Sequence, residues 1–226
     1  MRTNIRSLFV SAAVAAQVLA FSSLTTPARA PAAPAASTAP QPESAQKVVF
    51  AGGCFWGIEA VFESLKGVSS AVSGYAGGSA ATAHYEIVST GTTGHAESVE
   101  VTYDPAQISY EQLLEVFFLV AHDPTELNRQ GPDEGTQYRS VVFYTTDEQK
   151  RETEAFIGQL TKRKTYGAPI VTQVVPLVAF YPAEAYHQHF AARNPYYPYI
   201  VINDEPKLVH LRQQFPNLVK GGPKAS

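Results

Sequence analysis

The stretch KVVFAGGCFWGIEAVFESLKG, residues 47–67, contains a strand, a turn and a helix in succession. Lys47 to Ala51 is mostly apolar and predicts a short strand, and the pair Gly52-Gly53 turns the chain. Beyond the turn, apolar residues recur at the spacing of one helix face, at Ile58, Val61, Phe62 and Leu65, and Gly67 ends the helix. Cys54 lies four residues before Ile58, so we expect it on the same face, in the first helical turn.

Outward from this unit, apolar patterning predicts the remaining elements. Strands are expected at residues 68–75, 85–88, 97–103, 140–144 and 170–179, the last interrupted by Pro176. Helices are expected at residues 109–121, 147–164 and 183–193, with a partly helical tail from Asp204. This order predicts an α+β fold on a ferredoxin-like split β-α-β core. We expect a two-layer sandwich in which flanking helices cover a mixed, mostly antiparallel sheet.

The chain of 226 residues is long enough for one ordinary domain. Hydrophobic residues make up 45% and charged residues 16%, so most of the chain can build a core. The formal net charge is -3, which gives no basic excess. We therefore expect no nucleic-acid partner, because such partners select for basic surfaces.

The first 30 residues have the layout of a secretory signal peptide. Arg2 and Arg6 precede an apolar run, and small residues follow at Ala28-Arg29-Ala30. An uncleaved anchor is the alternative. Residues 31–46 are rich in Pro and Ala and predict a flexible linker, residues 47–216 the folded domain, and residues 217–226 a tail. We expect a protein that is secreted across the inner membrane into the periplasm.

Cys54 is the only cysteine in the sequence. It cannot form an intramolecular disulfide, so in an exported protein it is either an inert buried thiol or a reactive one. A helix N-terminus offers free N–H groups and a positive dipole end, and both favour a thiolate. Phe55 and Trp56 follow directly and can wall in a small apolar substrate. Ordinary packing is the alternative for Trp56.

Glu97 opens the predicted strand 97–103 with the parity of Val99, Val101 and Tyr103. It therefore points where the core residues point. Burial disfavours the charged form of a carboxyl and raises its pKa, which suits a general acid near neutral pH. A strand-end glutamate that reaches solvent is the alternative.

Two polar, Gly-rich segments have the character of functional loops, at residues 74–78 and 131–140. Tyr75, Tyr85 and Tyr138 lie in or beside them. A tyrosine hydroxyl can donate a hydrogen bond to an oxygen without bringing charge. Taken singly, each of these tyrosines is more often structural.

Gly53-Cys54-Phe55-Trp56-Gly57 resembles the signature of the A-type peptide-methionine sulfoxide reductases. Five more segments resemble that family in the same order: Gly74 to Gly78, Tyr85 to Val88, Gly94 to Glu97, Asp133 to Ser140 and Ala185 to Gln188. The resemblance extends over most of the predicted domain, from Lys47 to Phe215.

The resemblance implies a role for each site residue. Cys54 attacks the sulfur of methionine-(S)-sulfoxide and becomes a sulfenic acid. Glu97 supplies the proton to the leaving oxygen, and Tyr85 and Tyr138 donate hydrogen bonds to that oxygen. Asp133 orients the site, while Phe55 and Trp56 hold the S-methyl group. Tyr75 is structural by comparison.

The resemblance also implies substrates and a reductant. The substrates are oxidised proteins, which the enzyme repairs, and free methionine sulfoxide. Many relatives carry resolving cysteines near the C-terminus, one of them directly after a Pro-Tyr pair, where this chain has Pro198-Tyr199-Ile200. No cofactor is expected to be bound. Because the chain has no second cysteine, an external thiol must reduce the sulfenic acid. Thioredoxin, glutaredoxin or a similar thiol-disulfide reductase is the expected partner.

Two rival functions remain at this point. A cysteine hydrolase would pair Cys54 with a histidine such as His187 and would need an oxyanion hole. A non-catalytic module would bind oxidised methionine without turnover. The six histidines show no metal-ligand spacing in sequence, so we expect no metal site.

Overall fold

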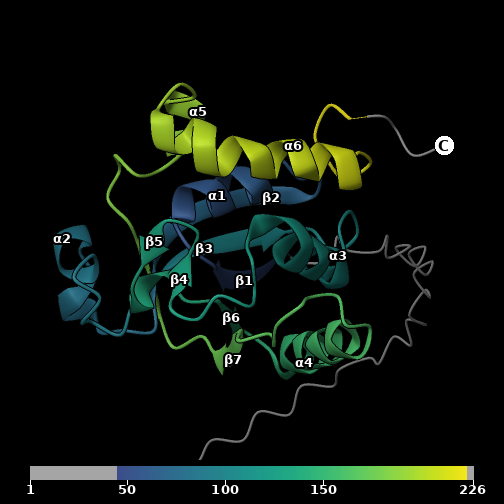
Figure 1. Ribbon diagram of the computed structural model, residues 1–226, viewed down its shortest axis with the longest axis horizontal. Helices are drawn as coiled ribbons and strands as arrows, with labels where there is room; N and C mark the ends of the chain where they lie inside the picture. Colours follow the sequence, from purple (N-terminus) through teal and green to yellow (C-terminus); the bar gives the residue numbers. More distant parts are fainter. Residues whose placement is uncertain (1–44, 223–226) are drawn as a thin grey trace, which may run out of the picture. The chain divides into compact units, whose positions relative to one another are not determined.

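The computed structural model describes residues 45–222 (Figure 1). The predicted signal peptide and residues 31–44 of the predicted linker lie outside these residues. Six strands form one sheet in the order β7-β6-β1-β3-β2-β8. All neighbouring pairs are antiparallel except β6 and β7, which are parallel. The predicted mixed, mostly antiparallel sheet is confirmed.

The split β-α-β core is built by the first three strands and the first helix. β1 (Gln46–Ala51) leads into α1 (Phe55–Glu63), which leads into β2 (Val68–Ala76). β3 (Ala96–Tyr103) then enters between β1 and β2 and pairs with both. α1 packs against β2 and β3. Cys54 and the start of β3 are therefore brought to the same end of the sheet.

The outer strands are shorter. β6 (Val141–Tyr144) pairs with β1, and β7 (Gln173–Pro176) continues the sheet beyond β6. β8 (Phe180–Pro182) forms the opposite edge, against β2. A separate two-stranded ribbon joins β4 (Arg129–Gln130) to β5 (Asp133–Glu134). The predicted strand at 170–179 is thus shorter than its pattern: β7 begins at Gln173 and ends at Pro176, which has no backbone N–H to donate.

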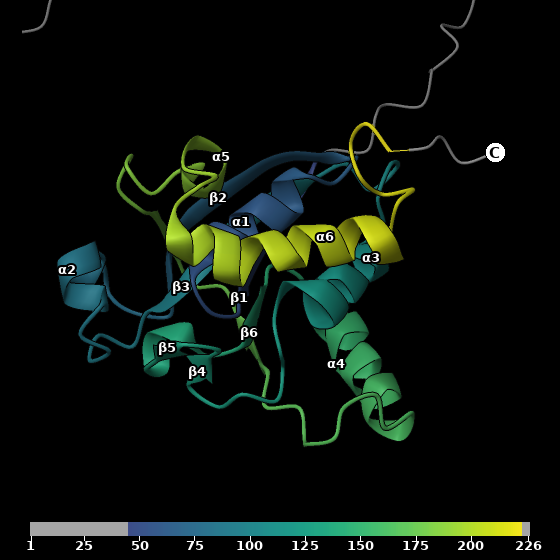
Figure 2. The same ribbon diagram turned by 45° about the horizontal axis from the view of Figure 1, so that its top comes forward.

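Helices flank the sheet, and both views place α6 alongside α1 (Figures 1 and 2). α3 (Tyr110–Val116) runs into a π-helical turn, η2 (Phe117–Ala121), and α4 (Asp147–Lys162) packs on α3. The side chain of Ser109 accepts from the Gln112 N–H, and Gln112 caps the Ser109 N–H in return. This capping box fixes the start of α3. A second π-helical turn, η4 (Ile200–Asp204), precedes α6 (Glu205–Gln214).

The sheet and its helices enclose one large apolar core. Val48 and Phe50 of β1 point into it, with the predicted inward residues of β3 and α1. The ring of Phe50 stacks on those of Phe62 and Phe117, with centroids 4.9 and 4.6 Å apart. No helix within residues 45–222 is long and apolar enough to cross a membrane.

Two predicted elements are wrong. Residues Tyr85–Val88 form a short helix, α2, rather than a strand, because the Val88 and Ser89 N–H groups close helical turns onto His84 and Tyr85. Short 3-10 turns occur at Ala80–Thr82 and Thr136–Tyr138. Of the helix predicted at 183–193, only α5 (Phe190–Arg193) forms. His189 precedes it with φ +53°, a left-handed conformation that a continuous α-helix cannot contain.

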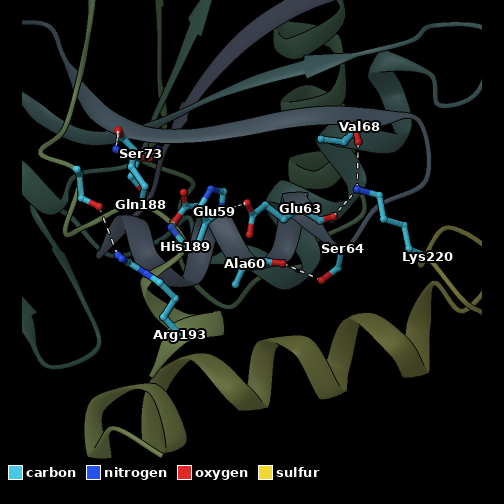
Figure 3. A network of polar contacts seen from close by, with 11 residues as sticks. Glu59, Ala60, Glu63, Ser64, Val68, Ser73, Gln188, His189, Arg193 and Lys220 are labelled. Atoms are coloured by element: carbon cyan, nitrogen blue, oxygen red, sulfur yellow. Dashed lines mark hydrogen bonds and ion pairs between the residues drawn. The ribbon is translucent and has the colours of Figure 1, made fainter. Parts of the chain in front are cut away.

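Polar contacts tie the C-terminal half of the chain to α1 and β2 (Figure 3). Glu59 of α1 accepts a hydrogen bond from the His189 N–H at 2.9 Å, and Glu63 contacts the His189 ring. The Gln188 side chain donates to the Ser73 carbonyl and accepts from the Ser73 N–H. Lys220 Nζ donates to the carbonyls of Glu63 and Val68. The bonds of His189 and Gln188 hold the loop 183–189 against α1 and β2, and those of Lys220 attach the chain after α6 to the end of α1 and the start of β2.

Candidate active site

Cys54 is the N-cap residue of α1 and is 8% exposed. It follows the Gly52-Gly53 turn, where Gly53 has φ +97°. A Cβ on Gly53 would lie 2.6 Å from Cγ of Gln130, so glycine is required by both conformation and space. The turn therefore presents Cys54 just beyond the end of β1, one position before the first helical residue instead of within the first turn as predicted.

Glu97 lies on β3 and is 2% exposed. Its Oε2 accepts a hydrogen bond from the Phe55 N–H at 3.2 Å, which joins it to the residue after Cys54. Burial raises the pKa of this carboxyl to about 8, and the negative charge of Asp133 also raises it, against the effect of the Phe55 N–H. Glu97 therefore holds a proton at neutral pH, as its inward parity predicts.

The thiol of Cys54 is less acidic than its helical position suggests. Burial raises its pKa well above the ordinary value, and negative charge on Glu97 and Asp204 raises it further. The Trp56 N–H and the Lys207 ammonium act in the opposite direction. The helix start thus favours the thiolate as expected, but desolvation outweighs it. At rest the site holds a thiol beside a protonated carboxyl.

An aromatic wall lines this end of α1. Phe55 is buried, and its ring centroid lies 4.9 Å from that of His187. Trp56 stacks on Phe190 at 3.8 Å, and its Nε1–H donates to Nδ1 of His187 at 3.1 Å. These contacts fix the orientation of the indole and make the surface next to Cys54 apolar. The sequence analysis names His187 only as the partner of Cys54 in a hydrolase, and it does not predict this contact with Trp56.

Tyr85, Tyr138 and Asp133 also gather around Cys54 and Glu97. Burial raises the pKa of both phenols, and negative charge on Glu97 raises it further, so both hydroxyls stay protonated as donors. Burial also raises the pKa of Asp133, while a hydrogen bond from the Tyr199 hydroxyl lowers it. The structure thus brings together the seven residues that the sequence predicts for the site: Cys54, Phe55, Trp56, Tyr85, Glu97, Asp133 and Tyr138.

Tyr75 and Glu184 serve a different purpose. The Tyr75 hydroxyl donates to Oε2 of Glu184 at 2.8 Å, and the Tyr85 N–H donates to Oε1 of the same carboxylate at 3.0 Å. Glu184 therefore anchors the start of α2 to β2. This arrangement agrees with the structural reading of Tyr75 and explains how Tyr85 is positioned without a strand.

The fold also assembles a group that sequence spacing does not show. Glu59, Glu63 and His189 have potential ligand atoms within 4.8 Å of one another. Oε2 of Glu59 accepts from the His189 backbone N–H, and Oε1 of Glu63 contacts Nδ1 of the His189 ring, so the group also connects α1 with the chain before α5 (Figure 3). Oε1 of Glu59 is buried and has no hydrogen-bond partner within residues 45–222.

A buried thiol at a helix start, next to a protonated carboxyl and an aromatic wall, defines a cysteine-dependent enzyme that delivers a proton to its substrate. Comparison with known proteins gives the family. Residues 46–218 match the model of the peptide methionine sulfoxide reductases. The chain belongs to this family.

The family's members include close relatives and solved structures. The chain is 58% identical over 178 residues to peptide methionine sulfoxide reductase MsrA 2 of Mesorhizobium japonicum, covering 79% of this chain and 91% of that protein. It is 54% identical over 175 residues to MsrA 2 of Synechocystis, covering 77% and 82%. Reduced Mxr1 of Saccharomyces cerevisiae superposes with a TM-score of 0.64 at 34% identity, covering 68% of this chain and 87% of that one.

The raised pKa of Glu97 predicts a stability signature that is independent of activity. An unfolded glutamate titrates near 4.5 and Glu97 near 8, so the folded state binds more protons between these values. The contribution of protonated Glu97 to the free energy of unfolding is therefore fully present below pH 4.5 and is lost progressively as the pH rises to about 8. Urea unfolding of wild type and Glu97→Gln should show wild type losing stability relative to the variant over this range. Parallel pH profiles would show that Glu97 titrates normally.

Proposed function

We propose that this protein reduces methionine-(S)-sulfoxide, free or in proteins, to methionine, through a sulfenic acid on Cys54. The observation that carries the proposal is the Cys54–Glu97 arrangement. A soft nucleophile starts α1, and a carboxyl with a pKa of about 8 accepts from the next N–H. Sulfoxide oxygen is a poor leaving group until it is protonated, and Glu97 carries the proton that this step needs.

The reaction balances with the groups present. The Cys54 sulfur attacks the sulfoxide sulfur and forms an S–S bond, and Glu97 gives its proton to the sulfoxide oxygen. The S–O bond to the methionine sulfur and the new S–S bond then break as the oxygen becomes the hydroxyl of the Cys54 sulfenic acid, and methionine leaves with a new electron pair on sulfur. The thiol proton of Cys54 replaces the proton lost by Glu97. Methionine sulfoxide is reduced by two electrons and Cys54 is oxidised by two.

The other site residues have supporting roles in this proposal. Tyr85 and Tyr138 donate hydrogen bonds to the oxygen, since both hydroxyls remain protonated. Asp133, held by Tyr199, orients the site. Phe55 and Trp56 take the S-methyl group against their rings. Methyl, oxygen and side chain are then ordered in one hand, which selects the S epimer.

An external thiol completes the cycle, because Cys54 is the only cysteine in the sequence. The position after Pro198-Tyr199 is occupied by Ile200, which is buried. We infer that thioredoxin, glutaredoxin or a similar thiol-disulfide reductase supplies the thiol. Oxidised proteins are the proposed substrates, so the activity is one of protein repair under oxidative stress. A hydrolase is not favoured, because Nδ1 of His187 accepts from Trp56 instead of activating a nucleophile.

Replacing the nucleophile should abolish the reaction. One equivalent of methionine-(S)-sulfoxide without added thiol should release one methionine from wild type and add one oxygen to Cys54, trappable by a dimedone-type reagent. Cys54→Ser should release none, while circular dichroism shows an intact fold. Mass spectrometry of the protein after this single turnover makes the measurement. Methionine release with Cys54 still a free thiol would disprove the scheme, and equal rates on both epimers would contradict the stereochemical assignment.

Removing the transferable proton should slow the sulfoxide step. Glu97→Gln keeps shape but cannot donate a carboxyl proton, and loss of a general acid typically costs about a hundredfold or more. Single-turnover rates of methionine release give the measurement. Glu100→Gln is the matched control, since Glu100 lies on the same strand and pairs with Lys47 instead. A Glu97→Gln rate close to the control rate would exclude Glu97 as the acid.

We also propose that residues 1–30 direct export and are removed, so that the enzyme works in the periplasm. The basic start, apolar run and small residues of this segment support the proposal. N-terminal sequencing of the protein from a periplasmic fraction should give a start near residue 31. Recovery of the full-length chain in the cytoplasmic fraction alone would contradict export.

A further inference from the structure

A cavity of about 250 Å³ lies beside Cys54, on the side of η4 and α6. The residues that matter here are Cys54, Asp123, Tyr199, Asn203 and Lys207, all of which line it. Of the seven residues predicted for the sulfoxide site, Cys54 lines this cavity. Phe55, Trp56, Tyr85 and Tyr138 are not among its lining residues. The nucleophile therefore borders a space whose wall holds none of these four side chains, and which meets the sulfoxide site at Cys54 and through the Tyr199–Asp133 hydrogen bond.

The ammonium group of Lys207, which lines this cavity, lies against the first turn of α1. A Cβ placed on Gly57 would come within 2.1 Å of Oδ1 of Asp204 and 2.8 Å of Nζ of Lys207. Gly57 is three residues after Cys54, so the absence of a side chain there lets a carboxylate and an ammonium approach the helix that holds the nucleophile. This gives a physical reason for glycine at the end of the Gly53–Gly57 motif.

Lys207 is held in place by a buried partner. Its Nζ donates to Oδ1 of Asp204 at 3.1 Å, and the two side chains are 18% and 0% exposed. Oδ2 of Asp204 is buried and has no hydrogen-bond partner within residues 45–222. A buried carboxylate is costly unless it is paired, so Lys207 is confined to this position instead of extending into solvent.

We propose that this cavity is the entrance by which an external thiol reaches oxidised Cys54, and that the Lys207 ammonium holds the incoming sulfur there as a thiolate. The inference deepens the proposed function and rests on it. The ligand is a thiolate, supplied by a small molecule or by a cysteine of a reductase. Lys207 is then a residue of the recycling reaction.

The recycling step balances as follows. The external thiol gives up its proton, and its sulfur attacks Sγ of Cys54 while the S–O bond breaks. The oxygen takes up a proton and leaves as water, and a mixed disulfide remains. A second thiol attacks that disulfide, releases Cys54 as a thiolate that regains its proton, and forms a disulfide of the reductant. Two thiols lose two electrons, and Cys54 gains two.

Charge favours Lys207 for this task. Its ammonium lowers the pKa of Cys54, whereas burial and negative charge on Glu97 and Asp204 raise it. Lys207 lines the cavity and Asp204 does not, so the ammonium is the charge of this ion pair that an incoming thiolate meets. Asp123 is the exposed acid of the cavity, and its Oδ1 accepts from the Thr125 N–H and hydroxyl at 2.9 and 2.6 Å. These two bonds fix the orientation of the Asp123 carboxylate within the turn.

The test measures recycling separately from sulfoxide reduction. The enzyme is first oxidised by one equivalent of methionine-(S)-sulfoxide, and the loss of dimedone-reactive Cys54 is then followed after adding thiol. In Lys207→Met, the second-order recycling rate below the pKa of the added thiol should fall by about tenfold, the change in thiolate fraction that one pKa unit gives. Lys207→Arg should restore most of it. Methionine release by the same samples should fall by a smaller factor.

A control variant and a double variant separate the loss of the Lys207 charge from a general effect of replacing a lysine and from misfolding. Lys150→Met is the control, because Lys150 pairs with an acid on its own helix, α4, far along the chain from the site. If Lys207→Met recycles as fast as this control, the inference is wrong. If Lys207→Met fails to fold because Asp204 is left unpaired, the double variant Asp204→Asn/Lys207→Met removes both charges and should show the same slow recycling. Absence of any sulfenic acid in wild type would refute the proposed function instead.

Two thiol sources distinguish the natural ligand. Dithiothreitol represents small thiols, and thioredoxin represents protein thiols. A loss of rate with both supports an entrance for any thiolate, and a loss with one of them assigns the cavity to that source. Equal rates for Lys207→Met and the control with both thiols would overturn the inference.

Discussion

The hydrogen bond from the Phe55 N–H to Oε2 of Glu97 is the interaction on which the site depends. It joins the start of α1 to β3, two elements that meet only because β3 inserts between β1 and β2. The bond holds a buried carboxyl next to the nucleophile, yet it does not offset the desolvation of that carboxyl, whose pKa remains at about 8. The fold thereby keeps the buried Glu97 carboxyl protonated beside Cys54, where it can give its proton to a leaving oxygen.

The sequence predicts this arrangement well because the signals are local. Period-two alternation puts Glu97 on the inner face of its strand, and helical spacing puts Cys54 at the start of α1. The split β-α-β order follows from the succession of elements, and the structure confirms it. The family resemblance gathers Tyr85, Asp133 and Tyr138, and the fold brings their side chains to the same place.

What the sequence misses depends on contacts between distant residues. Residues 85–88 alternate like a strand, but the Glu184 carboxylate accepts the Tyr85 N–H and leaves the segment free to form a helical turn. Of the helix predicted at 183–193, residues 183–189 form a loop instead, whose polar groups bond to β2 and α1. His187 lies in the family-like segment Ala185 to Gln188, but its contact with Trp56, whose Nε1–H donates to its Nδ1, joins residues 131 positions apart and forms only once these segments meet.

Burial and nearby charges set the protonation state of Cys54. Burial disfavours a thiolate most, and negative charge on Glu97, once ionised, and on Asp204 disfavours it further, whereas the Trp56 N–H and Lys207 favour one. The balance leaves a resting thiol, which resists adventitious oxidation because the thiolate is the form that oxidants attack. Sulfoxide reduction does not need a free thiolate in advance, since the thiol proton can replace the one that Glu97 delivers. A buried, protonated pair is thus compatible with both protection at rest and turnover with substrate.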